Sequence, residues 1–353
     1  MTVRWALLGP GRHAEKSVVR QMKAASGAEL VAVMSRDRAR GEAFARKHGI
    51  ARVHGSFDEV LNDGDIDALY HATPDGLHAQ HAIAGAQAGK HSLIEKPLAI
   101  SVPECVEAIE ACRRAGVKLG VVFNQRHEAV HQEARRMVLQ GEIGEVMLAQ
   151  VQIPLKTSAP TGAPSAPNWR IDPRLRSGGI LMSIGDHAFD TLSFLVAQSI
   201  DEVSAFTGAS EKDMRDERTA GMLLRLSKGA IGYAATTSKA PFARPPFEIH
   251  GTRGSLIIEN SYTYLTGAGE DPTPVLTIVN EAGRSTQRFA ATECFRLEVE
   301  QFSRAIEGKG EPMTPPEDGL RALVITDALY EAVRTRRVTR VEDFLPNGRA
   351  RNP

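Results

Sequence analysis

Short apolar segments alternate with longer amphipathic segments through residues 1–125. The apolar segments have the length of β-strands, and the segments between them repeat their apolar positions with the period of an α-helix. The predicted strands span residues 3–8, 29–34, 68–72, 91–94 and 118–123, and the predicted helices span residues 15–25, 38–48, 77–88 and 103–115. A left-handed residue commonly closes a helix, and the residues just past these helices include Gly27, Gly49, Gly89 and Gly116. The pattern predicts a parallel sheet with crossover helices.

The pattern changes after residue 125. A helix is predicted at 129–140 and a strand at 146–153, and residues 154–173 then hold five prolines, which predicts an ordered loop or lid. A helix follows the Gly178-Gly179 pair and reaches residue 197. Six strand-like segments come next without helices between them, at residues 200–208, 219–226, 231–238, 246–251, 254–259 and 275–280. This succession is typical of an antiparallel or mixed sheet. Helices at 296–307 and 316–336 end the pattern.

Composition narrows the classes of function. The 353 residues include 43 Lys and Arg and 43 Asp and Glu, so the net charge is zero and neither a nucleic acid nor an anionic membrane is an expected partner. No apolar run approaches the roughly 18 residues of a membrane span, and the first residues do not resemble a signal peptide. The three cysteines, Cys105, Cys112 and Cys294, have no metal-ligand spacing. We therefore expect no metal site, reduced thiols and a cytoplasmic location.

The first predicted strand leads into Gly9-Pro10-Gly11-Arg12-His13-Ala14, a G-x-G-x-x-A motif. The first glycine permits a tight turn, the second lets a pyrophosphate approach the backbone, and the small third residue allows close helix–strand packing. The N–H groups at the start of the next helix favour phosphate. The alternative is a turn with a structural role alone. At the end of a strand and the start of a helix the motif predicts dinucleotide binding, with Arg12 and His13 beside the phosphates. The fold class is therefore α/β, with a Rossmann domain at residues 1–125.

The end of the second strand discriminates between NAD and NADP. An NAD site usually has a carboxylate there for the ribose 2′-hydroxyl, whereas this chain has Ser35 and Arg36, with Arg40 nearby. A hydroxyl and guanidinium groups suit a 2′-phosphate, so NADP(H) is the preferred cofactor and NAD(H) the alternative. Arg38 is interpreted as part of a solvated helix face. Asp37 lies two residues past the usual position of that carboxylate and is close enough in the chain to bind a ribose hydroxyl instead.

Two further strand ends carry polar residues that suit the nicotinamide side of the crevice. The fourth strand is followed by a turn from Thr73 to His78, and the fifth ends in Glu95-Lys96-Pro97. A lysine at the carboxyl edge of a parallel strand faces the ligand crevice, and beside a cofactor it suits acid–base work at a carbonyl. The alternative is a surface lysine in a turn. We predict that Thr73, His78, Glu95 and Lys96 contact the cofactor.

Together, the G-x-G-x-x-A motif, Glu95-Lys96-Pro97 and the segment 177–190, Ser-Gly-Gly-Ile-Leu-Met-Ser-Ile-Gly-Asp-His-Ala-Phe-Asp, resemble the Gfo/Idh/MocA family over nearly the whole chain. The resemblance implies a Rossmann domain and a second, α+β domain at residues 126–353 with a large open mixed or antiparallel sheet. It also allows the C-terminal helix of the second domain to pack against the Rossmann domain. It also implies NAD(P)-dependent oxidation or reduction of sugars, polyols and related compounds, in a homodimer or homotetramer formed through the open sheet. Met34-Ser35, Arg40-Gly41 and residues 124–131 look most like an NADPH-dependent keto-sugar reductase of that family.

The resemblance also implies roles for single residues. Lys96 corresponds to the family's catalytic lysine and His187 to its catalytic histidine, while Asp190 matches a family aspartate. The aspartate that usually stands four residues before the histidine is replaced by Ser183. Positions 183, 186, 187 and 190 share a stripe of a regular helix, so Asp186 either restores the missing carboxylate or serves only as an acidic residue at a helix start.

The remaining site predictions concern ligand contacts. Asn124, Trp169 and Arg170 are predicted to contact the cofactor, and Arg126, Ser183, His187, Asp190 and Lys96 the sugar-like substrate. Trp169 and Arg170 either stack on and clamp a ligand or only hold the proline-rich segment in place.

The resulting mechanistic hypothesis is hydride transfer between a nicotinamide and a sugar carbonyl, with Lys96 and His187 handling the proton. Two alternatives remain at this point. One is a redox-silent sensor or repressor, and the other is a glycoside hydrolase that uses NAD without net redox change.

Overall fold

The computed structural model describes residues 2–154, 172, 174–208, 217–240, 247–261 and 273–346. The chain folds into two compact units. The first comprises Met1–Asn124, Ala166–Ser177 and Glu293–Leu323, and the second comprises Gln125–Ser165, Gly178–Thr292 and Val324–Pro353. Each unit is thus assembled from three stretches of the chain. Among the described residues, none of the helices combines the length and the apolar character needed to span a bilayer.

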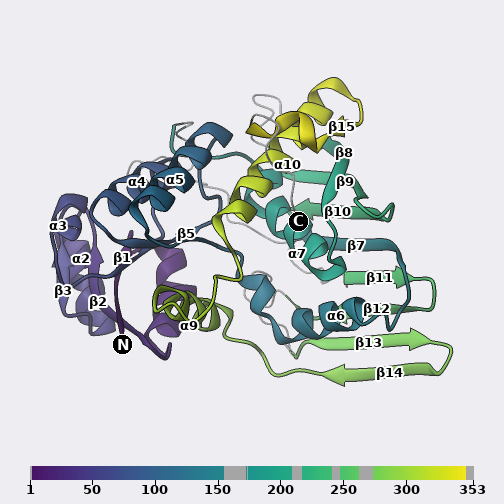
Figure 1. Cartoon of the computed structure of the whole chain (residues 1–353), viewed down its shortest axis with the longest axis horizontal. Helices are drawn as coiled ribbons and strands as arrows, with labels where there is room; N and C mark the ends of the chain where they lie inside the picture. Colours follow the sequence, from purple (N-terminus) through teal and green to yellow (C-terminus); the bar gives the residue numbers. More distant parts are fainter. Residues whose placement is uncertain are drawn as a thin grey trace. The chain divides into compact units, whose positions relative to one another are not determined.

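A six-stranded parallel sheet forms the centre of the first unit (Figure 1), which confirms the predicted parallel sheet. The strand order is β3-β2-β1-β4-β5-β6, the order of a Rossmann fold, and its switch point lies between β1 and β4. The strands are β1 (Val3–Leu8), β2 (Ala28–Met34), β3 (Arg52–His54), β4 (Ala68–His71), β5 (His91–Glu95) and β6 (Leu119–Val122). The three-residue strand β3 is absent from the sequence prediction because it is too short for an apolar pattern to develop.

The helices of this unit lie close to the predicted positions except α3, a five-residue helix that was not predicted. Their bounds are η1 (Ala14–Val18, π-helical), α1 (Val19–Lys23), α2 (Arg38–His48), α3 (Phe57–Leu61), η2 (Asp75–Leu77), α4 (His78–Gln87), α5 (Val102–Ala115) and α9 (Cys294–Ile306). Helices α4 and α5 lie side by side (Figure 1). The four glycines predicted to follow helices all have positive φ, between 61° and 73°. Trp5 of β1 is fully buried, and its indole contacts Phe302 of α9.

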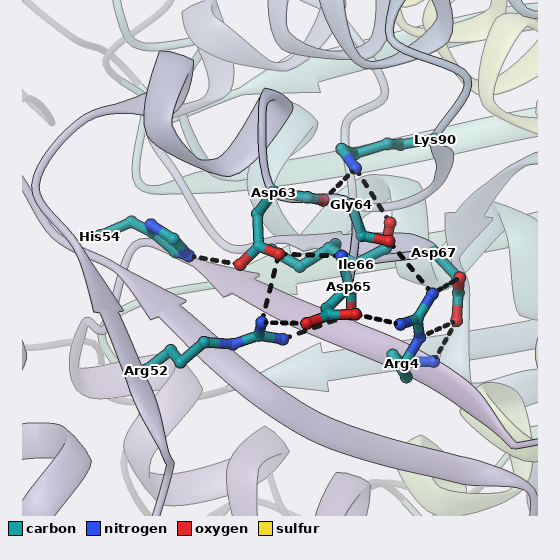
Figure 2. Close-up of polar contacts among 9 residues, drawn as sticks. All are labelled: Arg4, Arg52, His54, Asp63, Gly64, Asp65, Ile66, Asp67 and Lys90. Carbon is teal, nitrogen blue, oxygen red and sulfur yellow. Dashed lines mark hydrogen bonds and ion pairs between the residues drawn. The ribbon is translucent and has the colours of Figure 1, made fainter.

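The amino-terminal edge of this sheet is held by a polar network around the turn that precedes β4 (Figure 2). The Arg4 guanidinium donates from Nε to Asp67 Oδ2 at 3.0 Å and from a terminal nitrogen to Asp67 Oδ1 at 2.7 Å. Lys90 donates to the carbonyl oxygens of Asp63 and Ile66 at 2.8 and 2.9 Å. Because these residues lie at the starts of the strands, opposite the ends that carry the predicted site, we assign them a structural role.

A nine-stranded mixed sheet forms the second unit (Figure 1), as predicted. Its order is β14-β13-β12-β11-β7-β10-β9-β8-β15, and β7 and β10 are its parallel pair. The strands are β7 (Val146–Pro154), β8 (Ile200–Thr207), β9 (Thr219–Leu226), β10 (Ile231–Thr237), β11 (Phe247–Gly251), β12 (Gly254–Glu259), β13 (Val275–Asn280), β14 (Gly283–Arg288) and β15 (Thr339–Arg340). All six residues of β14 are exposed, so this strand has no apolar alternation by which a sequence could reveal it.

Among the described residues, helix α7 covers one face of this sheet, and side chains on the opposite face of three strands are exposed. The helical segments described in the second unit are η3 (Asn124–His127), α6 (Ala129–Leu139), η5 (Leu181–Gly185, π-helical), α7 (Asp186–Val196) and η6 (Val341–Phe344). Segment η3 begins at the last residue of the first unit's first stretch, and α10 (Pro316–Thr335) belongs to both units. Helix α7 packs on β7 and β10 and is buried along most of its length. Strand β9 alternates buried residues with more exposed ones. The same alternation exposes Phe206, Leu223 and Tyr233 on three adjacent strands.

Candidate functional site

The glycine-rich turn after β1 has the shape that the motif predicts. Gly9 has a φ of +82°, and a Cβ added to it would lie 2.8 Å from the carbonyl oxygen of Ala72. The nearest atom to a Cβ added at Gly11 is 3.8 Å away, so the space beside Gly11 is open. The turn therefore combines a close approach to the end of β4 with room for a ligand over its second glycine.

The residues after β2 are arranged around the start of α2. The Asp37 carboxylate accepts the backbone N–H of Arg40 at 3.0 Å and so caps the helix. The Arg40 guanidinium donates to the carbonyl oxygen of Pro10 at 3.1 Å, which ties α2 to the glycine-rich turn. Ser35 is buried, and its hydroxyl donates to the carbonyl oxygen of Asp37. Arg38 pairs with Glu42 on the exposed face of the helix, as predicted.

Thr73 and His78 follow β4 and Lys96 follows β5, at the carboxyl edge of the sheet where the glycine-rich turn also lies. Thr73 is 8% exposed, and its hydroxyl has no hydrogen-bond partner within the described ranges. The Lys96–Pro97 peptide bond is cis, and Lys96 is partly buried. His78 is 1% exposed, with Nδ1 2.7 Å from the carbonyl oxygen of Pro97 and Nε2 3.0 Å from that of Thr73. One imidazole thus touches both turns.

Glu95 accepts hydrogen bonds from two other elements. His13 Nε2 lies 2.8 Å from Glu95 Oε1, and the Tyr70 hydroxyl donates to the same oxygen at 2.7 Å. Burial by itself raises the pKa of Glu95, but His13, Tyr70 and the neighbouring Lys96 favour the carboxylate more strongly. The pKa of Glu95 therefore lies below its usual value, and a negative charge sits beside Lys96.

Three features of the first unit suit the binding of a dinucleotide. The turn at Gly9 and Gly11 lies at the switch point of the sheet, where ligands of such folds bind. The Thr73 hydroxyl stands at the same edge and has no hydrogen-bond partner in the described part of the chain, although buried polar groups normally have one. The exposed Arg12 and Arg36 form no ion pair with any residue that the structure describes.

In the second unit, a buried carboxylate organises the start of η5. Glu217 accepts the backbone N–H of Leu181 at 2.8 Å and the hydroxyl of Tyr330 at 3.2 Å. The Tyr330 hydroxyl also accepts the N–H of Gly179 at 3.3 Å. A Cβ at Gly178 would lie 2.7 Å from that hydroxyl. The glycine pair thus lets a carboxylate and a phenol reach the first turn of the helix that carries the predicted catalytic histidine.

The residues predicted around His187 do not share one environment. Ser183 lies in η5 and is exposed, whereas Asp186, His187 and Asp190 in α7 are between 1% and 8% exposed. A π-helical turn widens the helix before α7, so positions on its two sides do not follow a single α-helical stripe. Asp186 Oδ1 accepts the backbone N–H of His187 at 2.7 Å.

Arg126 and Asp190, both predicted to contact substrate, pair with each other. Nε of Arg126 donates to Asp190 Oδ2 at 3.1 Å, and a terminal nitrogen donates to Oδ1 at 2.5 Å. Their side chains are 11% and 8% exposed. The guanidinium carbon also lies 5.5 Å from the centre of the Phe194 ring. The two hydrogen bonds between the Arg126 guanidinium and the Asp190 carboxylate join η3 to α7. Asn124, at the start of η3, is 1% exposed.

The sequence predictions omitted Tyr70, Glu217 and Tyr330, which hold parts of the site. Their partners are 25, 36 and 113 or more residues away in the chain, and no motif marks them. Trp169 and Arg170, with most of the proline-rich segment, lie outside the described residues.

Two family models match the chain. Residues 3–123 match the oxidoreductase family with an NAD-binding Rossmann fold, and residues 131–257 match the GFO/IDH/MocA C-terminal domain. The two matches cover the glycine-rich turn, the Glu95-Lys96-Pro97 segment and the helix that carries His187.

Characterised relatives align over nearly the full length. The chain is 32% identical to 1,5-anhydro-D-fructose reductase of Ensifer adhaerens over 345 residues, which are 97% of this chain and 99% of the relative. It is 31% identical to D-xylose 1-dehydrogenase (NADP(+)) 2 of Haloferax volcanii, covering 94% of this chain and 97% of the relative. The structure of aldose-aldose oxidoreductase from Caulobacter crescentus, in complex with glycerol, superposes with a TM-score of 0.85 at 24% identity, covering 96% of this chain and 100% of that one. The sequence resemblance to a keto-sugar reductase is thereby confirmed.

Proposed function

Because the chain belongs to the Gfo/Idh/MocA family of NAD(P)-dependent oxidoreductases, we propose that it reduces the carbonyl group of a keto-sugar, or oxidises the matching alcohol, with NADP(H) as its preferred cofactor. The names of the similar enzymes support a sugar or polyol substrate. The observation that carries the proposal is the set of strand ends in the first unit, where the open turn at Gly11, the Thr73 hydroxyl and Lys96 follow β1, β4 and β5. These relatives are oxidoreductases, so neither the sensor nor the glycoside hydrolase alternative is favoured.

Lys96 is the proposed proton donor to the carbonyl oxygen. A nicotinamide cofactor, when bound at this site, would supply or accept the hydride. An ammonium group beside the reacting oxygen stabilises the negative charge that grows there and delivers its proton. Glu95 supports this role because its carboxylate, held charged by His13 and Tyr70, places a negative charge next to Lys96 in the chain.

His187 is the proposed second catalytic residue, on the substrate side. Its imidazole is 5% exposed, and the helix that carries it is anchored at its start by Glu217. Asp186 is the proposed carboxylate of this group in place of the family's aspartate at position 183. The contact of its Oδ1 with the His187 backbone supports a fixed place for it beside the histidine. The predicted contacts with the substrate also include Ser183, Arg126 and Asp190. The predicted contacts with the cofactor include Asn124, Trp169 and Arg170.

The preference for NADP(H) is supported by the residues after β2. The Asp37 carboxylate is used as a helix cap, so it does not take the place of the ribose-binding carboxylate of an NAD site. Arg36 is exposed and forms no described ion pair, and Arg40 is held against the glycine-rich turn. Two guanidinium groups at this place favour a 2′-phosphate over a 2′-hydroxyl.

The test begins with titrations of the purified protein with NADPH and NADH, followed by absorbance assays with the preferred cofactor. The substrates are 1,5-anhydro-D-fructose, D-xylose and myo-inositol, each with the cofactor form that its reaction requires. We expect tighter binding of NADPH than of NADH, and turnover of at least one of these three compounds. Lys96→Ala should lower kcat by about 10²–10⁴-fold while cofactor affinity changes little. Lys118→Ala is the matched control, since Lys118 lies before β6 and pairs with Glu311. Near-normal turnover by Lys96→Ala would refute the assignment.

The open sheet is the proposed surface for a homodimer or homotetramer. Phe206, Leu223 and Tyr233 are 78%, 53% and 37% exposed on adjacent strands, and Leu223 lies directly opposite Tyr233. Apolar side chains gathered on one uncovered sheet face indicate contact with another protein surface, here a second copy. Light scattering should show that Leu223→Glu dissociates the assembly, whereas Ser285→Glu on the polar strand β14 leaves it intact.

The proposed location is the cytoplasm. Cys105 and Cys112 are buried free thiols, and burial raises the pKa of Cys105 to about 12 and that of Cys112 to about 11. Such thiols suit a reducing compartment. Cell fractionation with a tagged chain tests this proposal, and we expect the tag in the cytoplasmic fraction.

A further inference from the structure

The His78 side chain joins the turns that follow two neighbouring strands. Thr73 follows β4, and Pro97 follows Lys96 at the end of β5; β4 and β5 are paired in parallel. The imidazole lies between the two turns, with Nδ1 2.7 Å from the Pro97 carbonyl oxygen and Nε2 3.0 Å from the Thr73 carbonyl oxygen. At 1% exposure the ring is shielded from water, so these carbonyl groups are its polar surroundings.

The chemistry of the two contacts makes the bond to Pro97 the stronger tie. Carbonyl oxygens only accept, so a neutral imidazole can donate to one of them and a protonated imidazole to both. The Pro97 contact is the shorter, and we assign the N–H to Nδ1. In that tautomer the Pro97 bond is present whether or not the ring carries a charge.

We propose that His78 is a positioning residue for Lys96. By holding the carbonyl group of the next residue, Pro97, it fixes the direction in which the Lys96 side chain leaves the turn. A ring that carries both protons also donates from Nε2 to the Thr73 carbonyl oxygen and then holds the turn after β4 as well. This inference rests on the proposed role of Lys96 as proton donor, because a catalytic group displaced by about 1 Å can lose about 10²-fold in rate.

His81 offers a matched comparison on the same helix. Its ring packs against Phe57, with ring centres 4.2 Å apart, and it contacts neither turn by a described hydrogen bond. Burial, together with the nearby His78, lowers the pKa of His81 to about 4, so it is neutral at pH 7. His81→Leu therefore removes a partly buried imidazole from α4 without removing a hydrogen bond to Thr73 or Pro97.

The first experiment does not depend on activity. Amide hydrogen exchange of the full chain is compared between the wild type, His78→Leu and His81→Leu. We expect faster exchange in peptides covering residues 73–77 and 95–101 in His78→Leu alone. Unchanged exchange there, or the same increase in His81→Leu, would overturn the proposal, and it would do so whatever the substrate of the enzyme is.

The second experiment separates positioning from stability. We expect His78→Leu to lower kcat about 10- to 100-fold with a smaller effect on KM, and His78→Asn to recover part of the loss, because its amide nitrogen can occupy the place of Nδ1. If His78 acts through Lys96, the losses in Lys96→Ala and in the double variant should be nearly equal. Additive losses, or a normal kcat in folded His78→Leu, would overturn the inference. A failure of the Lys96 assignment itself would show separately, as normal turnover in Lys96→Ala.

Discussion

A carboxylate oxygen of Glu217 occupies the space into which a side chain at Gly179 would project. The other oxygen accepts the N–H of Leu181, in the first turn of η5, where helical N–H groups lack partners within the helix. The Gly178-Gly179 pair is thus a packing requirement set by a residue almost forty positions away. It fixes the beginning of the helical segment that leads to His187.

We expect Gly179→Ala to destabilise the protein by about 1–3 kcal/mol, because the added methyl group must displace a buried carboxylate. Activity should fall with it, since the helix start that precedes His187 would move. Urea unfolding measures the first effect. Gly221→Ala in β9 is the control, as no atom lies within 4 Å of a Cβ added there. Equal stability of the two variants would contradict this explanation of the glycine pair.

Cofactor choice should depend on Arg36. Removing its guanidinium in Arg36→Ala should weaken NADPH binding about tenfold and leave NADH binding nearly unchanged, because only NADPH has a 2′-phosphate to pair with it. Fluorescence titration with both cofactors measures the ratio. Arg38→Ala is the matched control, since Arg38 is already paired with Glu42 on the helix surface. If both variants lose the same affinity, the effect is one of general charge.

The buried pair of Arg126 and Asp190 should contribute to stability as a unit. Asp190→Asn removes one charge of a pair whose side chains are about one-tenth exposed, and we expect a loss of about 3–5 kcal/mol. The double variant Arg126→Met/Asp190→Leu should recover much of it, because no unpaired charge remains. Denaturant unfolding of the three proteins is the measurement. A purely ligand-binding role for Asp190 would instead leave the unfolding midpoint of Asp190→Asn unchanged.

Acid should weaken the network around the turn before β4. The hydrogen bonds from Arg4 hold the pKa of Asp67 below its usual value in the folded protein. The contact therefore stabilises the fold above the unfolded pKa of about 3.9, and this contribution disappears as the pH falls through the lower, folded pKa. We expect Asp67→Asn to lose about 1 kcal/mol at pH 7 and less at pH 3.

Thermal unfolding across this pH range tests the sign of the Asp67 effect. Asp58→Asn, on the exposed first turn of α3, is the control, because the Asp58 carboxylate forms no ion pair with the described residues. A difference from the wild type that stays constant with pH would show that the Asp67 charge is not responsible.

The sequence by itself determined the strands and helices of the first unit except the short β3 and α3, and it determined the position of the glycine-rich turn. These features follow from local chemistry, since the period of apolar residues specifies the element and glycine permits positive φ at its end. The turn at Gly9 could be predicted because the G-x-G-x-x-A motif that marks it is continuous in the sequence. The family motifs around Lys96 and His187 are likewise continuous in the chain.

The tertiary structure alone decided which side chains meet. Glu217 with Gly179, His78 with Pro97, and Arg126 with Asp190 are brought together by folding, and neither member of a pair predicts the other from spacing. Strand β14 shows the same limit at the level of an element, because its residues are polar and pairing with β13 makes it a strand. Hydrogen bonds between residues far apart in the chain depend on the whole path of the backbone, which no local pattern contains.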